Sequence, residues 1–177
     1  MQIELMFTGF GGQGILLMGK IVALTALKVG KEVAWVPSYG PEMRGGTAYC
    51  TVVISDKKIG SPVIKYPSHL VAMNRPSLEK FAPSVKPGGV ILINTTLIQV
   101  DSGRDDVDEL KVPVTDIAVN LGTVKVANMV ALGAFVYHSK VFDFKTVSNV
   151  VKKEFSKKPH LIDLNIEAME QGKKSVL

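Results

Sequence analysis

Three glycines near the N-terminus have the spacing of a turn that binds phosphate groups. Gly9, Gly11 and Gly14 lie between two apolar stretches, in the segment Thr-Gly-Phe-Gly-Gly-Gln-Gly. Glycine lets the backbone turn sharply and approach a ligand, and the helix that follows directs free N–H groups at an anion. Gly12 and Gln13 add polar backbone and a side-chain amide. The segment predicts a strand-to-helix turn that faces an anionic ligand, and a dinucleotide is the first candidate.

A dinucleotide site has a second requirement, which this chain does not meet. An acidic residue at the end of the second strand holds the ribose hydroxyls. The second predicted strand ends at Pro37 and Ser38 without an acid. Glu42 follows only in a loop, and Arg44 lies beyond the position where NADP would need a basic residue. The sequence therefore counts against NAD and NADP.

The loop over residues 38–46 is the second candidate for chemistry. Loops that follow the first two strands of an open α/β sheet meet at its carboxyl edge, so this loop and the glycine turn are expected to share one crevice. Arg44 would present a guanidinium to a phosphate or a carboxylate there. The alternative is a surface loop in which Arg44 is solvated and the glycines only permit turns.

Strand and helix patterns alternate along the chain and would position these segments. Strands are predicted over residues 3–7, 32–37, 47–55, 69–73, 90–94 and 112–116, with 59–61 as a short edge. Helices are predicted over residues 14–29, 77–81, 128–138, 146–155 and 161–171. The alternation predicts an α/β fold, a Rossmann-like open, mostly parallel sheet with helices on both faces and room for antiparallel edge strands.

Composition excludes several function classes. The 177 residues are expected to form one domain, 1–177, and the apolar fraction of 46% and charged fraction of 21% are ordinary for a soluble protein. No apolar run is long enough to cross a bilayer, so no membrane is expected as a partner. The net charge is +5, but the lysines are dispersed and not interleaved with aromatic residues, so nucleic acid is not expected either.

Cys50 is the only cysteine, which limits both redox and metal chemistry. The chain has no internal disulfide, which fits a cytoplasmic location, and it cannot hold a cysteine-ligated iron–sulfur cluster or a zinc site of several thiolates. Cys50 itself is expected to be a small buried side chain. The acidic residues between positions 101 and 109 are expected to form a solvated turn, since their spacing fits no calcium loop.

Asparagines mark further positions at the expected crevice. Asn94 ends a central strand, where it either faces the crevice or bonds the next loop, and both interpretations stay open. Asn120 and Asn128 flank a loop-to-helix step and are expected to serve as turn and cap residues.

Two N-terminal motifs together carry a family resemblance. The turn over residues 9–14, followed by Pro37-Ser38-Tyr39-Gly40-Pro41-Glu42-Met43-Arg44-Gly45-Gly46, resembles the gamma subunit of 2-oxoacid:ferredoxin (2-oxoacid:acceptor) oxidoreductases. Later segments agree with it, at residues 73–78, 93–94 and 126–133. The resemblance covers nearly the whole chain and is strongest to the 2-oxoglutarate or branched-chain 2-oxoacid enzymes.

The resemblance implies a place in a larger enzyme. Such a holoenzyme decarboxylates a 2-oxoacid such as 2-oxoglutarate or pyruvate with thiamine diphosphate and magnesium, passes two electrons through iron–sulfur clusters to ferredoxin, and forms acyl-coenzyme A. Those cofactors belong to alpha, beta and, in some members, delta subunits. This chain has no Gly-Asp-Gly signature for thiamine diphosphate and too few cysteines for a cluster. It is therefore expected to bind no cofactor, to carry no catalytic residue and to be inactive alone.

Two alternatives from other classes stay open, a stand-alone Rossmann-type nucleotide-binding oxidoreductase and a non-enzymatic regulatory module. In the family interpretation the crevice faces a partner subunit or the coenzyme A path. The candidate crevice or interface residues are Gly9, Gly11, Gly12, Gln13, Gly14, Ser38, Met43, Arg44, Gly45, Gly46 and Asn94.

Overall fold

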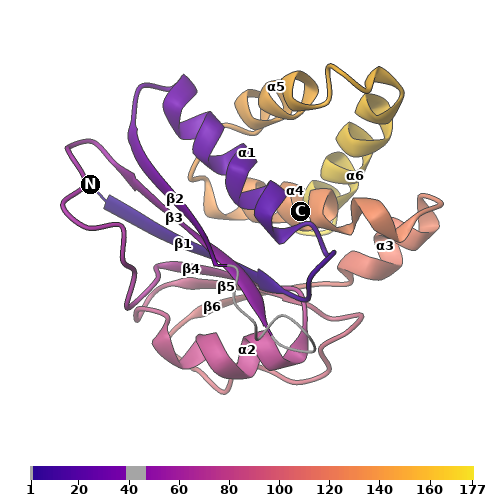
Figure 1. The fold of residues 1–177 in the computed structure, drawn as a ribbon. Helices are drawn as coiled ribbons and strands as arrows, with labels where there is room; N and C mark the ends of the chain where they lie inside the picture. Colours follow the sequence, from indigo (N-terminus) through magenta and orange to yellow (C-terminus); the bar gives the residue numbers. More distant parts are fainter. Residues whose placement is uncertain (1, 39–46) are drawn as a thin grey trace.

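The computed structural model describes residues 2–38 and 47–177, and one six-stranded sheet runs through them (Figure 1). The strands are β1 (Gln2–Gly9), β2 (Glu32–Ser38), β3 (Ala48–Ser55), β4 (His69–Ala72), β5 (Val90–Asn94) and β6 (Asp108–Val112). Their order across the sheet is β2-β3-β1-β4-β5-β6. The predicted open α/β sheet is confirmed.

Strand direction divides the sheet into two parts. The neighbours β1, β4, β5 and β6 pair in parallel, whereas β3 is antiparallel to both β1 and β2. The sheet is thus mostly parallel, and its antiparallel strand lies between β2 and β1 rather than at an edge. The two strands that follow β1 in the chain, β2 and β3, lie on one side of β1 in the sheet, and β4 lies on its other side. The carboxyl ends of β1 and β4 therefore form a topological switch point, where open α/β sheets bind ligands.

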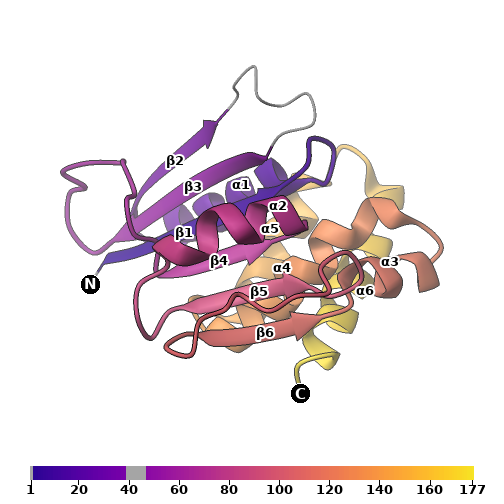
Figure 2. The ribbon, with the colours of Figure 1, turned by 90° about the horizontal axis from the view of Figure 1, so that it is seen from below.

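Helices cover both faces of the sheet, as predicted. They are α1 (Ile15–Lys28), α2 (Arg75–Phe81), α3 (Val114–Asn120), α4 (Ala127–Ser139), α5 (Phe144–Glu154) and α6 (Ile162–Lys174), with short 3₁₀ turns at Ala82–Ser84, Val124–Val126 and Pro159–Leu161. In Figure 1, α1, α4, α5 and α6 lie above the sheet and α2 lies below it. Figure 2 shows α2 in front of β1 and β4.

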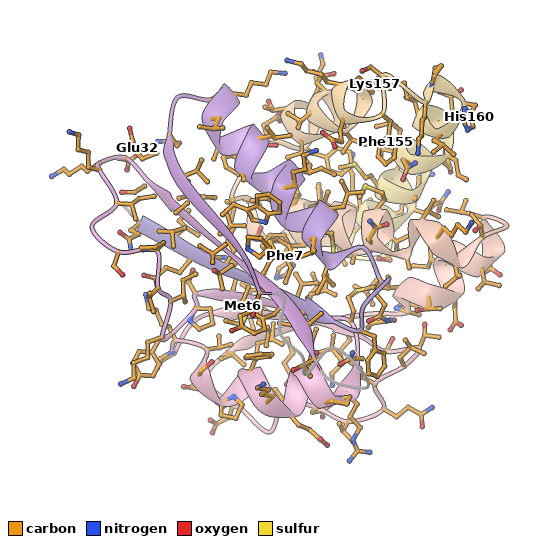
Figure 3. All side chains as sticks on the ribbon, in the orientation of Figure 1. Met6, Phe7, Glu32, Phe155, Lys157 and His160 are labelled. Atoms are coloured by element: carbon orange, nitrogen blue, oxygen red, sulfur yellow. The ribbon has the colours of Figure 1, made fainter. Side chains whose placement is uncertain are left out.

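Alternation along β1 assigns side chains to the two faces. Leu5 and Phe7 enter the core under α1 and α4, while Met6 enters the smaller core under α2. Figure 3 shows Phe7 and Met6 on opposite sides of the strand. Phe7 packs edge-to-face on Phe135 of α4 with 5.8 Å between ring centroids. Because side chains alternate along the strand, β1 packs into both cores, and these contacts fix the strand from which the turn after Gly9 begins.

Helix α4 forms a buried layer between the sheet and α6. Most of its residues are buried, as expected for a helix that is apolar on all sides. Two glycines let α4 and α6 approach closely, since a Cβ on Gly133 would overlap the Met169 backbone and one on Gly172 would overlap the Val130 backbone. The crossing places Asn128, at the start of α4, over the β1–α1 turn.

Two details of the predicted elements were wrong. The last strand covers Asp108–Val112 rather than 112–116, because Pro113 has no N–H to extend the ladder and the chain enters α3 directly after it. Residues 59–61 form no strand. Asp108 and Glu109 consequently open β6 instead of belonging to a solvated turn.

Among the described residues, no helix is long and apolar enough to span a membrane.

Candidate functional site

The glycine turn joins β1 to α1 at the switch point of the sheet. Gly12 has φ 89° and Gly14 has φ 73°, which is the left-handed region that favours glycine. Gly9 is extended but crowded, because a Cβ there would lie 2.5 Å from the Gln13 side-chain oxygen and 3.0 Å from Met73 Cβ. The turn therefore favours glycine at three positions: Gly12 for its backbone conformation, Gly9 for space, and Gly14 for both.

Gln13 occupies the inside of this turn with its own side chain. Its Oε1 accepts a hydrogen bond from the Phe10 backbone N–H at 2.7 Å, and its Nε2 donates to the Met73 carbonyl at 3.4 Å. The amide thus ties the turn to the loop after β4. One N–H group that a phosphate could have used is already taken.

Asn94 makes a similar connection one strand further along. Its Nδ2 donates to the Met73 carbonyl at 3.3 Å and to Thr115 Oγ1 at 3.0 Å, and its Oδ1 accepts from the Thr115 N–H at 3.4 Å. The side chain is buried. Of the two interpretations, the hydrogen bonds favour the one in which Asn94 holds the neighbouring loops.

Asn128 contacts the turn from the opposite side. Its Nδ2 donates to the Gly14 carbonyl at 3.4 Å across 114 positions of sequence. The predicted cap role is wrong, since α4 begins at Ala127 with Val126 at the capping position. Sequence reasoning missed this contact, because no local pattern reports which helix crosses over the turn.

An open pocket of about 300 Å³ lies where the turn meets the tip of β2. It is lined by Gly11, Gly12, Gly14, the residues that open α1, and by Ser38 and Ala48. The structure therefore brings together the glycine turn and Ser38, as expected from their place at one edge of the sheet. Met43, Arg44, Gly45 and Gly46 lie outside the described residues.

The chemistry available at this pocket is that of backbone groups and the Ser38 hydroxyl, because its other lining side chains are apolar. The tip of β2 carries no acid, and its one acidic residue, Glu32, stands at the opposite end of the strand. The first turn of α1 has no acidic residue either, which leaves the positive end of the helix dipole unneutralised by its own sequence. Among residues 2–38 and 47–177, no three His, Cys, Asp or Glu side chains come together as a metal site.

Burial shifts the pKa values of two side chains outside the pocket, Cys50 in the core and the partly buried His69. Burial raises the pKa of Cys50 to about 12, and its Sγ lies 3.4 Å from the Ile15 carbonyl beneath α1. Burial lowers the pKa of His69 to about 4, at the start of β4 against Phe135. Neither residue lines the pocket, so neither supplies acid–base chemistry there.

Comparison with known proteins gives a consistent assignment. The family described as Pyruvate ferredoxin/flavodoxin oxidoreductase matches residues 4–175. Ketoisovalerate oxidoreductase subunit VorA of Methanothermobacter thermautotrophicus is 40% identical over 97% of this chain, which spans only 36% of that relative. The 2-oxoglutarate synthase subunit KorC of Methanocaldococcus jannaschii is 38% identical over 89% of this chain and 81% of its own length.

Solved structures share the fold. A keto/oxoacid ferredoxin oxidoreductase gamma subunit from Geobacter sulfurreducens superposes with a TM-score of 0.84 at 30% identity, covering 98% of each chain. A 2-oxoglutarate:ferredoxin oxidoreductase from Magnetococcus marinus, with 2-oxoglutarate, coenzyme A and succinyl-CoA bound, gives a TM-score of 0.87 at 25% identity. It covers 99% of this chain, which spans 31% of that larger one.

Proposed function

Since this chain belongs to the pyruvate ferredoxin/flavodoxin oxidoreductase family, we propose that it acts as the gamma subunit of a multi-subunit 2-oxoacid:ferredoxin oxidoreductase. The observation that carries the proposal is its end-to-end match with a separate gamma chain, 98% of each, at 30% identity. Residues 1–177 would form one gamma domain. The resemblance inferred from the two N-terminal motifs is confirmed at the level of the family.

The proposed complex converts a 2-oxoacid, coenzyme A and oxidised ferredoxin into acyl-CoA, CO₂ and reduced ferredoxin, with two electrons transferred in each turnover. Alpha and beta subunits, with delta as a further candidate, would hold thiamine diphosphate, magnesium and the iron–sulfur clusters. A single cysteine in this chain supports that division of labour. It also fits a reducing compartment, so we place the complex in the cytoplasm.

The pocket between the glycine turn and Ser38 is proposed to face a companion subunit or the path of coenzyme A. Its volume of about 300 Å³ suits one end of a ligand or one side chain. Left-handed glycines at positions 12 and 14 and the unneutralised N-terminus of α1 favour a negatively charged or carbonyl-bearing group there. Asn94 and Gln13 would keep the pocket wall in place.

The substrate is proposed to be a branched-chain 2-oxoacid or 2-oxoglutarate. Both classes appear in the names of relatives of similar identity, 40% for the ketoisovalerate enzyme and 38% for the 2-oxoglutarate enzyme. Pyruvate is assayed beside these two kinds of 2-oxoacid, and the three form the substrate panel used below.

Co-expression with the neighbouring genes of the native operon tests the function. A tag on this chain should recover companion subunits, and the complex should reduce ferredoxin only with coenzyme A and one of the 2-oxoacids of the panel. A lone monomer, either fully active or without companions, would contradict the proposal. Titration of the isolated chain with NADH and NADPH tests the nucleotide-binding alternative, which micromolar binding would support.

The Arg44→Ala variant tests the role of the loop over residues 38–46. We expect its fold to be nearly unchanged, because the sequence predicts a loop there and a loop arginine contributes at most about 1 kcal/mol to stability. The turnover or assembly of the complex should fall. Normal turnover by the assembled Arg44→Ala complex would refute a functional role for this residue.

A further inference from the structure

One partly exposed side of α1 carries three leucines together with Lys20 and Lys28. Leu17, Leu24 and Leu27 lie on one side of the helix, separated by seven and three residues. Leu17 and Leu24 are only half-buried, and Leu27 is 58% exposed. Such a face is expected on a helix that another element covers. Leu27 is the most exposed of the three leucines.

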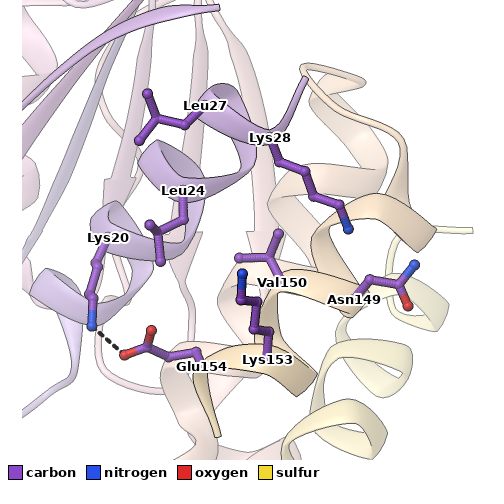
Figure 4. A pocket seen from close by; sticks show the side chains of 8 residues that line it. All are labelled: Lys20, Leu24, Leu27, Lys28, Asn149, Val150, Lys153 and Glu154. Carbon is purple, nitrogen blue, oxygen red and sulfur yellow. Dashed lines mark hydrogen bonds and ion pairs between the residues drawn. The ribbon is translucent and has the colours of Figure 1, made fainter. Parts of the chain in front are cut away.

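This face forms one wall of a groove between α1 and α5. The groove has a volume of about 770 Å³, comparable with about two turns of an α-helix 10 Å wide. Leu24 and Leu27 of α1 and Val150 of α5 form the apolar part of its lining, called its floor below, and Figure 4 labels them. The same helix face continues through Leu17 into the pocket beside the glycine turn. The groove and the candidate site thus lie along the same helix, although they share no lining residue.

Lysines surround the apolar floor. Lys20, Lys28 and Lys153 line the groove, together with the single carboxylate of Glu154. Lys20 pairs with Glu154 across the groove (Figure 4). Lys28 and Lys153 make no ion pair within the part of the chain that the structure describes. The groove thus combines an apolar centre with two uncompensated positive charges, the arrangement of a protein interface core with a charged rim.

We propose that this groove binds an acidic, amphipathic helix from a companion subunit, an inference that rests on the proposed function. A third helix fits between two packed helices, because ridges of its side chains enter the groove between them. Its apolar residues would cover Leu24, Leu27 and Val150. Its carboxylates would pair with Lys28 and Lys153, which supplies the charge complementarity that fixes partner and orientation.

A nucleic acid suits this groove less well. Its phosphates would meet the lysines, but an apolar floor without aromatic side chains offers its bases nothing to stack on. A protein helix matches both the floor and the rim.

Charge reversal provides the first test. In the complex co-expressed from the native operon, the double variant Lys28→Glu/Lys153→Glu should weaken association of a companion subunit by about tenfold or more, as measured by the concentration dependence of native mass spectra. The Lys174→Glu variant is the matched control. Lys174 is exposed and also lies in the last turn of its helix, so its reversal has a helix-dipole cost of the kind that each of the two test substitutions has, but it should leave assembly unchanged.

Cross-linking identifies what lies in the groove. Cys50 is buried, so the thiol of a Leu27→Cys variant can be labelled selectively with a maleimide photo-cross-linker in the isolated chain, which is then combined with its companion subunits and illuminated. The cross-link should map to a helix of a companion subunit that is rich in Asp and Glu. A cross-link to nucleic acid, to a non-acidic segment, or to no companion would overturn the inference.

The outcomes separate this inference from the proposed function. An active complex that assembles normally with both lysines reversed would refute the groove as an interface and leave the function standing. If no complex forms with the unmodified chain, both are refuted.

Discussion

Asn128 at the start of α4 donates through its amide nitrogen to the carbonyl oxygen of Gly14, the residue at which α1 begins. A Cβ on Gly14 would overlap that same amide. The glycine turn is therefore limited on its outer side by a helix that comes more than a hundred positions later in the chain. Gly14 is needed both for its left-handed backbone and for the space that Asn128 fills.

Alanine substitutions at Gly14 and at Gly12 distinguish the need for a left-handed backbone from the need for space. Gly14→Ala should lower the free energy of unfolding by more than about 2 kcal/mol, from a left-handed alanine and from overlap with Asn128. Gly12→Ala has the same backbone cost, about 1 kcal/mol, but meets no atom within 4 Å. Urea unfolding measures both. Equal losses in the two variants would show that Asn128 imposes no steric limit. If the overlap is real, the double variant Gly14→Ala/Asn128→Ala should recover the stability by which Gly14→Ala falls below Gly12→Ala.

The Gln13 amide should control the protection of one backbone group. Gln13→Ala removes the acceptor of the Phe10 N–H, so hydrogen exchange at that amide should accelerate, with a stability loss of about 1 kcal/mol. Gln13→Glu retains an acceptor oxygen and should keep the Phe10 amide protected, although it loses the donor to Met73. Unchanged Phe10 exchange in Gln13→Ala would mean that the side chain does not fill the turn in solution.

Cys50 should be chemically silent in the folded chain. Burial raises its pKa to about 12, and the thiolate is the reactive form, so Ellman's reagent at pH 8 should modify it only after unfolding. The control is the same chain in guanidinium chloride, where one thiol should react at once. Rapid stoichiometric modification of the native protein would contradict the packing of α1 on β3.

His69 should make stability depend on pH in the acid range. Its folded pKa is about 4 because of burial, against about 6.5 in an unfolded chain. Between these values the unfolded state binds a proton that the folded state does not, so stability is retained above pH 6.5 and lost as the pH falls towards 4. The loss at pH 4.5 relative to pH 7 is about 2 kcal/mol.

Comparison of the wild type with His69→Gln isolates this contribution from the carboxylates. Urea unfolding at both pH values should show a smaller decrease for His69→Gln, while His160→Gln, in an exposed position, should behave as the wild type does. An identical pH dependence of His69→Gln and wild type would indicate that folding does not lower the pKa of His69.

Local patterns predicted much of the fold, because they report burial. The apolar runs of β1, β4 and β5 are buried on both faces, and glycine and proline punctuate them, so their positions follow from residue type. Direction is not part of that signal. The β-branched segment of β3 has the same appearance in either direction, so its antiparallel place between β1 and β2 could not be deduced.

The site was predictable only where it follows from local sequence. The shared pocket of Ser38 and the glycine turn follows from the rule that loops meet at the carboxyl edge of the sheet. The contact of Gln13 with Met73 depends on the pairing of β4 with β1, and that of Asn128 with Gly14 depends on which helix lies over the turn. Amide side chains carry no spacing signature for such long-range bonds.

The position of β3 between β1 and β2 sets how long a ligand must be to contact both the glycine turn and Ser38. Neighbouring strands lie about 4.8 Å apart, so β2 stands about 10 Å from β1 instead of the single spacing of a dinucleotide fold. A ligand that spans the glycine turn and Ser38 must be longer than a pyrophosphate-to-ribose distance by about one strand width. The antiparallel strand β3 thus leaves the glycine turn as it is in a nucleotide-binding protein. It increases the length that a ligand needs to contact both this turn and Ser38.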